Sequence, residues 1–176
     1  MDKLIYLDNA ATTRIYPEVA ETIRKESVED FFNPSALYKP SVALSVKIKN
    51  ARESIKSTLK APDGELYFLS GGSEADNTAL FCTRKPKGSR IIVGEGEHDA
   101  IINSANQLAG QGFDVKFAPI NKDGSINVEE FEKLLDESVS LVSIMHVSNE
   151  TGAVNDIAKL VRLTRKHCPK AVFHSD

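Results

Sequence analysis

The chain has 176 residues, and its 22 lysines and arginines against 25 aspartates and glutamates give a formal net charge of −3. Hydrophobic residues make up 41% and charged residues 27%, which predicts a soluble globular protein with its own core and excludes a disordered or fibrous chain. The slightly acidic balance provides no broad basic surface, so nucleic acid is not expected as the main partner.

No apolar run approaches the roughly 20 residues that a membrane-spanning helix needs, and the N-terminal apolar stretch is too short for a signal peptide. The two cysteines, Cys82 and Cys168, stand far apart, which indicates neither a disulfide framework nor a metal-binding pair. We expect both to be ordinary packing residues on helices. The sequence therefore predicts a cytoplasmic protein with no membrane partner and no metal site.

The first part of the chain is predicted to be mainly helical. A short β-like piece at Leu4–Leu7 precedes a helix from Pro17 to about Glu29, where the proline takes a favoured first-turn position. A second helix is expected from about Pro40 to Leu59, because its apolar residues recur at helical spacing. Turns are expected at Asn33–Ser35 and at Ala61–Gly64.

Beyond these turns the chain alternates between strand and helix patterns. Short apolar runs predict buried strands at Leu66–Leu69, Arg90–Val93, Val115–Ala118, Leu141–Met145 and Ala171–Phe173. Helical patterns lie between them at Glu74–Thr83, Ala100–Leu108, Val128–Leu135 and Ile157–His167. Such alternation implies an α/β fold with a mostly parallel sheet flanked by helices. We expect residues 1–60 to form an N-terminal helical segment and residues 61–176 the α/β portion.

The last predicted strand stops at the end of the chain, which reads Phe173-His174-Ser175-Asp176. In a doubly wound domain a crossover normally follows such a strand and covers the sheet. We therefore expect the α/β portion to be truncated at Asp176. A sheet left open in this way is expected to be prone to aggregation or to be covered by a complementary chain.

Four polar segments follow predicted strands and are candidates for a binding site. They are Ser70–Glu74, Glu95–His98, His146–Gly152 and the terminal Asp176. Ligands of open α/β sheets bind outside the carboxyl ends of the strands, so we expect these segments to converge on one pocket.

The first two segments offer an anion site and an imidazole. Gly71, Gly72 and Ser73 join a strand to a helix, where backbone N–H groups and the serine hydroxyl could hold a phosphate. The alternative is a tight turn with Ser73 as the N-cap of the helix. His98 could stack on a planar ring or move protons near neutral pH, and the alternative for it is a surface or capping role.

The other two segments offer an amide and a carboxylate. Asn149 could exchange a hydrogen bond with a substituent of a ligand ring, although turn chemistry alone would also explain it. Asp176 is expected in a half-buried place, where a carboxylate needs a cation such as a protonated heterocyclic nitrogen. The alternative for Asp176 is the N-cap of a following helix.

Six motifs carry a resemblance across the whole chain. They are YLDNAATT near the start, NPS at residues 33–35, SGGSEADN at 70–77, EGEHDAI at 95–101, SIMHVSNETGAV at 143–154 and the terminal FHSD. In order and spacing they resemble the cysteine desulfurases of the NifS/IscS type, which are class V, fold-type I enzymes that use pyridoxal 5'-phosphate. The fold implied is the N-terminal part of the large domain of such a transferase.

The resemblance implies a role for each candidate residue. Gly72 and Ser73 match the family's phosphate-binding pair, and His98 matches the imidazole that stacks on the pyridine ring and transfers protons. Asn149 matches the amide beside the ring, and Asp176 matches the partner of the pyridinium nitrogen. The implied reaction takes sulfur from L-cysteine, leaving alanine and an enzyme persulfide. The implied partners are a second copy of the protein and a sulfur-acceptor or scaffold protein of iron–sulfur cluster biosynthesis.

The sequence also departs from the family's pattern. Gly72 and Ser73 stand where Ala-Thr is usual, Ser148 replaces a common Asn, and the His that commonly follows the NPS segment is absent. The family's Schiff-base Lys, persulfide-forming Cys and carboxylate-binding Arg are expected beyond residue 176, so we expect this chain alone to be inactive. The alternatives are another class V enzyme, such as a selenocysteine lyase or an aminotransferase, or a non-catalytic half-domain that pairs with another chain.

Overall fold

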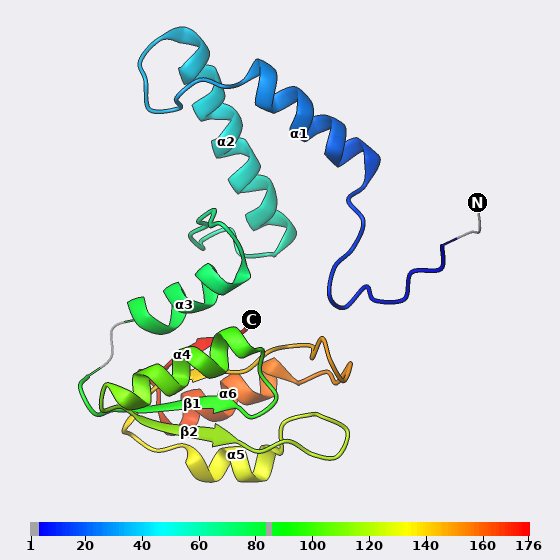
Figure 1. The fold of residues 1–176 in the computed structure, drawn as a ribbon. Helices are drawn as coiled ribbons and strands as arrows, with labels where there is room; N and C mark the ends of the chain where they lie inside the picture. Colours follow the sequence, from blue (N-terminus) through cyan, green and yellow to red (C-terminus); the bar gives the residue numbers. More distant parts are fainter. Residues whose placement is uncertain (1–3, 84–85) are drawn as a thin grey trace. The chain divides into compact units, whose positions relative to one another are not determined.

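The computed structural model describes residues 4–83 and 86–176 of the chain (Figure 1). The chain divides into two compact units, one that ends at Phe68 and one that begins at Leu69. None of the helices in the described ranges is long and apolar enough to cross a membrane. The domain boundary expected between residues 60 and 61 stays a prediction.

The first unit contains two helices, α1 (Pro17–Glu29) and α2 (Lys39–Thr58), both predicted to within about one residue at each end. Each begins with a proline in its first two positions, where the missing backbone N–H costs nothing. The Lys47 ammonium group of α2 contacts the Glu26 carboxylate at 2.5 Å and the Asp30 carboxylate at 2.7 Å. These ion pairs tie α2 to the end of α1.

Two short segments that were expected to be strands form none. The segments Leu4–Leu7 and Leu66–Leu69 have no strand structure, and the side chains of Leu7 and Tyr67 are 87% and 75% exposed. An apolar run becomes a strand only when a neighbouring strand completes its backbone hydrogen bonds, and no described strand pairs with either segment. Both predictions are therefore wrong.

The second unit is an α/β layer structure. Its elements in chain order are α3 (Gly72–Cys82), β1 (Arg90–Gly94), α4 (Asp99–Gly110), β2 (Asp114–Ala118), α5 (Val128–Leu134), β3 (Val139–Ser143), α6 (Ile157–His167) and β4 (Val172–His174). The four strands pair in parallel in the order β2-β1-β3-β4. This confirms the predicted α/β fold with a parallel sheet flanked by helices.

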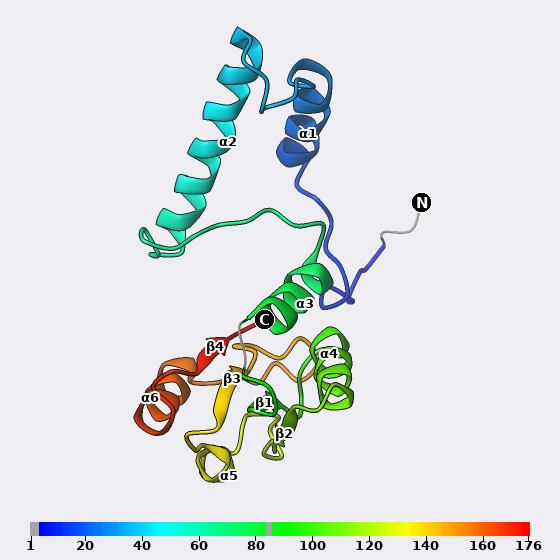
Figure 2. The same ribbon diagram turned by 90° about the vertical axis from the view of Figure 1, so that its left-hand side faces the viewer.

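Helices cover both faces of the sheet (Figure 2). Ile91 and Val93 of β1 pack on one side against a cluster that includes Leu80 of α3 and Ile101 of α4. Ile92, which points to the opposite face, packs into the cluster that contains residues of α5 and α6. A strand buried on both faces explains why β1 is apolar without alternation.

Two further expectations need correction. The strand β3 begins and ends two residues earlier than predicted, because Ile144 and Met145 are buried but lie beyond its last paired residue, Ser143. Cys82 is exposed and is not a packing residue, whereas Cys168 is buried as expected. Burial sets the apolar pattern of a sequence, and it does not by itself mark where the hydrogen-bonded ladder stops.

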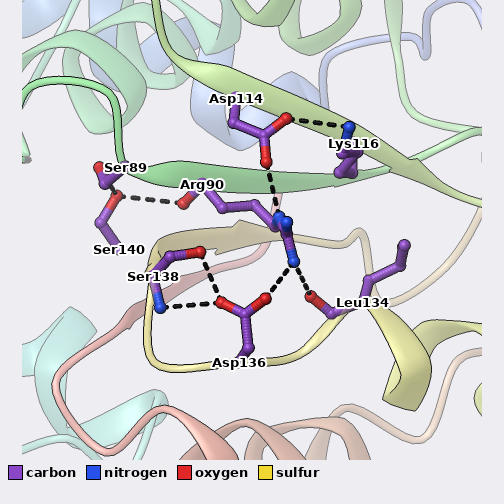
Figure 3. A network of polar contacts seen from close by, with 8 residues as sticks. All are labelled: Ser89, Arg90, Asp114, Lys116, Leu134, Asp136, Ser138 and Ser140. Carbon is purple, nitrogen blue, oxygen red and sulfur yellow. Dashed lines mark hydrogen bonds and ion pairs between the residues drawn. The ribbon is translucent and has the colours of Figure 1, made fainter.

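Arg90, at the start of β1, joins this strand to the start of β2 and to the segment before β3 (Figure 3). Its guanidinium group donates to the Asp114 carboxylate at the start of β2 at 2.8 Å, to the Asp136 carboxylate, and to the carbonyl oxygen of Leu134 at 3.1 Å. The hydrogen bond to Asp114 is the largest contribution that raises the pKa of Arg90. A planar group with several fixed donors suits this triple contact better than an ammonium group.

We expect the Arg90→Ala substitution to lower the free energy of unfolding by about 2 kcal/mol, since it removes charge-assisted hydrogen bonds from a side chain that is only 22% exposed. Urea unfolding of the variant measures the loss. Arg162, on the exposed surface of α6, provides the matched control as Arg162→Ala. Equal stability of the two variants would contradict the role of Arg90.

Candidate functional site

The carboxyl ends of β1, β3 and β4 meet at one edge of the sheet, because all the strands are parallel. His98 follows β1 by four residues, Asn149 follows β3 by six, and Asp176 follows β4 by two. The end of the chain lies beside α3 in both ribbon views (Figures 1 and 2). The expected ligand edge therefore carries three of the four predicted polar segments, and the fourth, Ser70–Glu74, follows no described strand and leads into α3.

The first turn of α3 is open to a ligand. The N-cap residue is Gly71, which makes no side-chain cap, and Ser73 lies inside the helix, so the alternative of Ser73 as N-cap is wrong. A Cβ atom built on Gly71 or Gly72 would meet nothing within 4 Å. Unpaired N–H groups at a helix start, together with a hydroxyl, are suited to bind an anion.

His98 begins α4. Its Nδ1 atom accepts the backbone N–H of Ala100 at 3.1 Å, so the ring caps the helix and still lies exposed. The capping alternative is thus confirmed, and it leaves the rest of the ring available. A pocket of about 350 Å³ is lined by Ser73 and His98, together with Asn77, Asp99, Ala100, Asn103, Ser104 and Gln107.

One hydrogen bond joins the helix that contains Ser73 to the helix that His98 caps, and a second continues it to Ser73 within α3. The Ser104 hydroxyl of α4 donates to Asn77 Oδ1 of α3 at 3.0 Å, and Asn77 Nδ2 donates to the Ser73 carbonyl oxygen at 2.6 Å. The side chain of Asn77 therefore fixes the first turn of α3 against α4. This contact joins the anion-binding turn to the helix that His98 caps.

Buried ionisable groups lie behind these two residues. Asp76 of α3 is 4% exposed, and its Oδ1 atom lies 3.9 Å from His174 Nε2. Burial raises the pKa of Asp76, the Asp176 charge raises it further, and His174 and His98 oppose the rise. Burial lowers the pKa of His174, whose Nδ1 atom lies 2.9 Å from the Ser143 hydroxyl.

Asp176 is exposed, so the expectation of a half-buried carboxylate is wrong. It lies beyond His174, the last paired residue of β4, and no element of the described residues packs over it. Because β4 runs parallel to β1 and β3, Asp176 lies at the same carboxyl edge of the sheet as His98, and its charge raises the pKa of Asp76 and of Glu97.

The structure thus groups Ser73, His98 and Asp176 around Asp76. Asn149 is exposed in the turn that the Gly152 N–H closes on the Ser148 carbonyl oxygen at 2.9 Å, and it does not line the pocket of Ser73 and His98. Its turn-chemistry alternative fits this geometry.

Three ionisable residues of this edge were missed from the sequence, namely the buried Asp76 and Glu97 and the partly buried His174. For Asp76 a signal existed, because it lies four residues before the buried Leu80 and so shares its helix face. For Glu97 and His174 the only signal was their position close to the ends of apolar strands.

Comparison with known proteins identifies the family. Residues 5–176 match the family model described as aminotransferase class-V. The chain belongs to this family. Among its relatives, it is 37% identical to the cysteine desulfurase IscS of Clostridium botulinum (strain Kyoto / Type A2), covering 100% of this chain and 45% of that protein. It is 34% identical to the cysteine desulfurase NifS of Azotobacter vinelandii, covering 98% and 43%.

Solved structures agree with the fold. A NifS-like protein superimposes with a TM-score of 0.89 at 31% identity, covering 98% of this chain and 48% of the other. A structure described as SspA in complex with cysteine gives 0.87 at 31% identity, covering 97% and 50%. These findings confirm the resemblance read from the motifs. This class V chain spans about half the length of the relatives it matches.

Proposed function

We propose that this class V chain forms the cofactor-binding part of a cysteine desulfurase, with pyridoxal 5'-phosphate as its cofactor. The single observation that carries the proposal is the pocket that Ser73 and His98 line together at the carboxyl edge of the sheet. The names of its relatives support the reaction, and the likeness to SspA, whose structure is a complex with cysteine, supports L-cysteine as the substrate.

The residues of the pocket, with Asp176 and Asn149 after the strands β4 and β3, fit this cofactor. The open first turn of α3 and the Ser73 hydroxyl would hold the phosphate, since they offer unpaired donors at the positive end of a helix dipole. The His98 ring would lie against the aromatic ring, and the Asp176 carboxylate would pair with the protonated ring nitrogen. The bound group supplies an electron sink to the amino acid, and these side chains hold and orient it. Asn149 would add a hydrogen bond to a ring substituent.

The partners of the reaction follow as proposals from the same likeness. A second copy of the protein would complete the enzyme as a homodimer, and a sulfur-acceptor or scaffold protein would take the sulfur. Both would act in the cytoplasm. Within the described residues, no lysine lines the pocket of Ser73 and His98, and neither Cys82 nor Cys168 does. We therefore assign neither the Schiff-base Lys nor the persulfide-forming Cys.

The test titrates pyridoxal 5'-phosphate into the protein expressed from its complete gene and follows the visible absorbance of the bound cofactor. We expect saturable binding that Ser73→Ala weakens about tenfold, because that substitution removes a hydrogen bond to a charged phosphate. Ser27→Ala, on the exposed surface of α1, is the matched control and should bind as wild type does. Sulfide and alanine formed from L-cysteine are then measured against a cofactor-only control. Failure of the wild type to bind the cofactor would contradict the proposal.

A further inference from the structure

Glu97 is a buried acid with one hydrogen-bonded carboxylate oxygen and one that has no hydrogen-bond partner in the described residues. Its side chain is 8% exposed, and Oε1 accepts the backbone N–H of Met145 at 2.6 Å. Oε2 is buried and has no hydrogen-bond partner within residues 4–83 and 86–176. Burying a carboxylate oxygen without a hydrogen bond costs folding free energy, so its presence beside the candidate site requires a physical explanation.

The hydrogen bond from Met145 belongs to a chain of buried contacts at the base of one loop. The Met145 carbonyl oxygen accepts from Asn155 Nδ2 at 2.9 Å, and Asn155 Oδ1 accepts from the Ile126 N–H at 2.8 Å. The N–H of Asn155 donates to the His146 carbonyl oxygen at 2.8 Å. The loop that contains Asn149 is therefore clamped where it leaves and rejoins the core, and Glu97 supplies the contact to the turn before α4.

The space around the carboxyl group is tight. A Cβ atom on Gly94 would lie 2.7 Å from Glu97 Oε1, so any side chain at this point of β1 would displace the Glu97 carboxyl group. A hollow of about 10 Å³ adjoins the side chain and is lined by Gly96, Glu97, Ile120, Gly124, Ile126, Met145, Ser148 and Asn155. Such a volume holds about one water molecule at most. None of these neighbours carries a charge that could neutralise a carboxylate.

We propose that Glu97 is a positioning residue, which sets the loop of Asn149 against the turn of His98 by accepting the N–H of Met145. The inference rests on the proposed function, since it assigns Glu97 a task in placing two residues of the cofactor site. Glu97 itself touches neither cofactor nor substrate in this scheme. His98 is its direct neighbour in the chain and the N-cap of α4, so Glu97 anchors the turn that carries the imidazole.

The charge state of Glu97 supports this assignment. Burial raises its pKa to about 7, the Met145 N–H opposes the rise, and the negative charges of Asp176 beyond β4 and Asp76 of α3 add to it. On its own turn, Glu95 and Asp99 are exposed acids that flank it together with His98. Because the effect of burial outweighs that of the Met145 hydrogen bond, the closed turn is favoured while Glu97 is uncharged, and ionisation favours an open turn in which the carboxylate reaches water.

The test measures hydrogen exchange of the Met145 amide by NMR on the protein expressed from its complete gene. Because the open turn has an ordinary carboxyl pKa, wild-type protection should fall about tenfold between pH 5.5 and pH 7, after correction for the intrinsic exchange rate. Glu97→Gln keeps an acceptor without a charge, so its protection should stay high across this range. Glu97→Ala should lose about tenfold in protection even at pH 5.5. Glu95→Gln, an exposed acid of the same turn, should match wild type.

Binding of pyridoxal 5'-phosphate to the same variants forms the second readout. We expect weaker binding with Glu97→Ala and binding close to wild type at pH 5.5 with Glu97→Gln. Met145 protection that is unchanged in Glu97→Ala, or independent of pH in wild type, overturns the inference whatever the cofactor does. If the Met145 amide shows the expected exchange pattern but the protein binds no cofactor, the proposed function is contradicted and the contact between Glu97 and Met145 is still supported.

Discussion

The Asp176→Asn substitution is expected to lower sulfide release from L-cysteine by about 100-fold in the protein expressed from its complete gene. A carboxylate within a few ångströms of a ring nitrogen favours the protonated nitrogen by about one to three pKa units, and the neutral amide loses this effect. Asp176 lies beyond the last paired residue of β4, at a strand end where the carboxylate adds little to packing, so the free energy of unfolding should hardly change. Turnover of L-cysteine and urea unfolding together measure both quantities.

Asp63 offers a matched control for this experiment, because it is an exposed aspartate in the turn after α2. Asp63→Asn should leave turnover and stability as in wild type. A turnover of Asp176→Asn equal to that of wild type would show that this carboxylate has no part in holding the ring nitrogen protonated.

The stability of the protein should fall as the pH rises from about 4.5 to 7, through a contribution of about 3 kcal/mol from Glu97 alone. The pKa of Glu97 rises from its ordinary value of 4.5, which applies to the unfolded chain, to about 7 in the folded protein. Between these values the folded protein binds more protons than the unfolded chain, so raising the pH favours unfolding. Above pH 7 both states are ionised and the contribution is fully lost.

Glu97→Gln separates this effect from all other titrations. The carboxylates whose pKa is lowered by ion pairs, such as Asp114 and Asp136, act in the opposite direction, and they are common to both proteins. From pH 5 to pH 8, the free energy of unfolding of wild type should therefore fall relative to that of the variant. Urea unfolding at these two pH values provides the measurement, and a constant difference would place the Glu97 carboxyl in water.

Sequence patterns predicted the sheet and most helices because burial itself leaves a mark in the sequence. The amphipathic pattern of residues 157–167 and the continuous apolar run of β1 each follow from the surfaces they pack against. The segment Leu66–Leu69 shows where this reasoning ends. Its residues are as apolar as those of a true strand, but strand formation depends on a partner that no local pattern reveals.

The candidate site was predictable in outline and not in its supporting contacts. The parallel topology alone brings His98 and Asp176 to one edge. The hydrogen bond between Glu97 and Met145 joins residues 48 positions apart in the chain, and its burial depends on Gly94 leaving space. The exposure of Asp176 was misjudged for a similar reason, since burial depends on which elements pack over a strand end.

The hydrogen bond at the start of α4 fixes the tautomer of His98. Because Nδ1 accepts the N–H of Ala100, its lone pair is engaged and the neutral ring carries its hydrogen on Nε2. A proton taken up by this ring must arrive at Nδ1, where it displaces the helix cap. Proton transfer at His98 would then be accompanied by a loosening of the first turn of α4, which links a chemical step to the local order of a helix end.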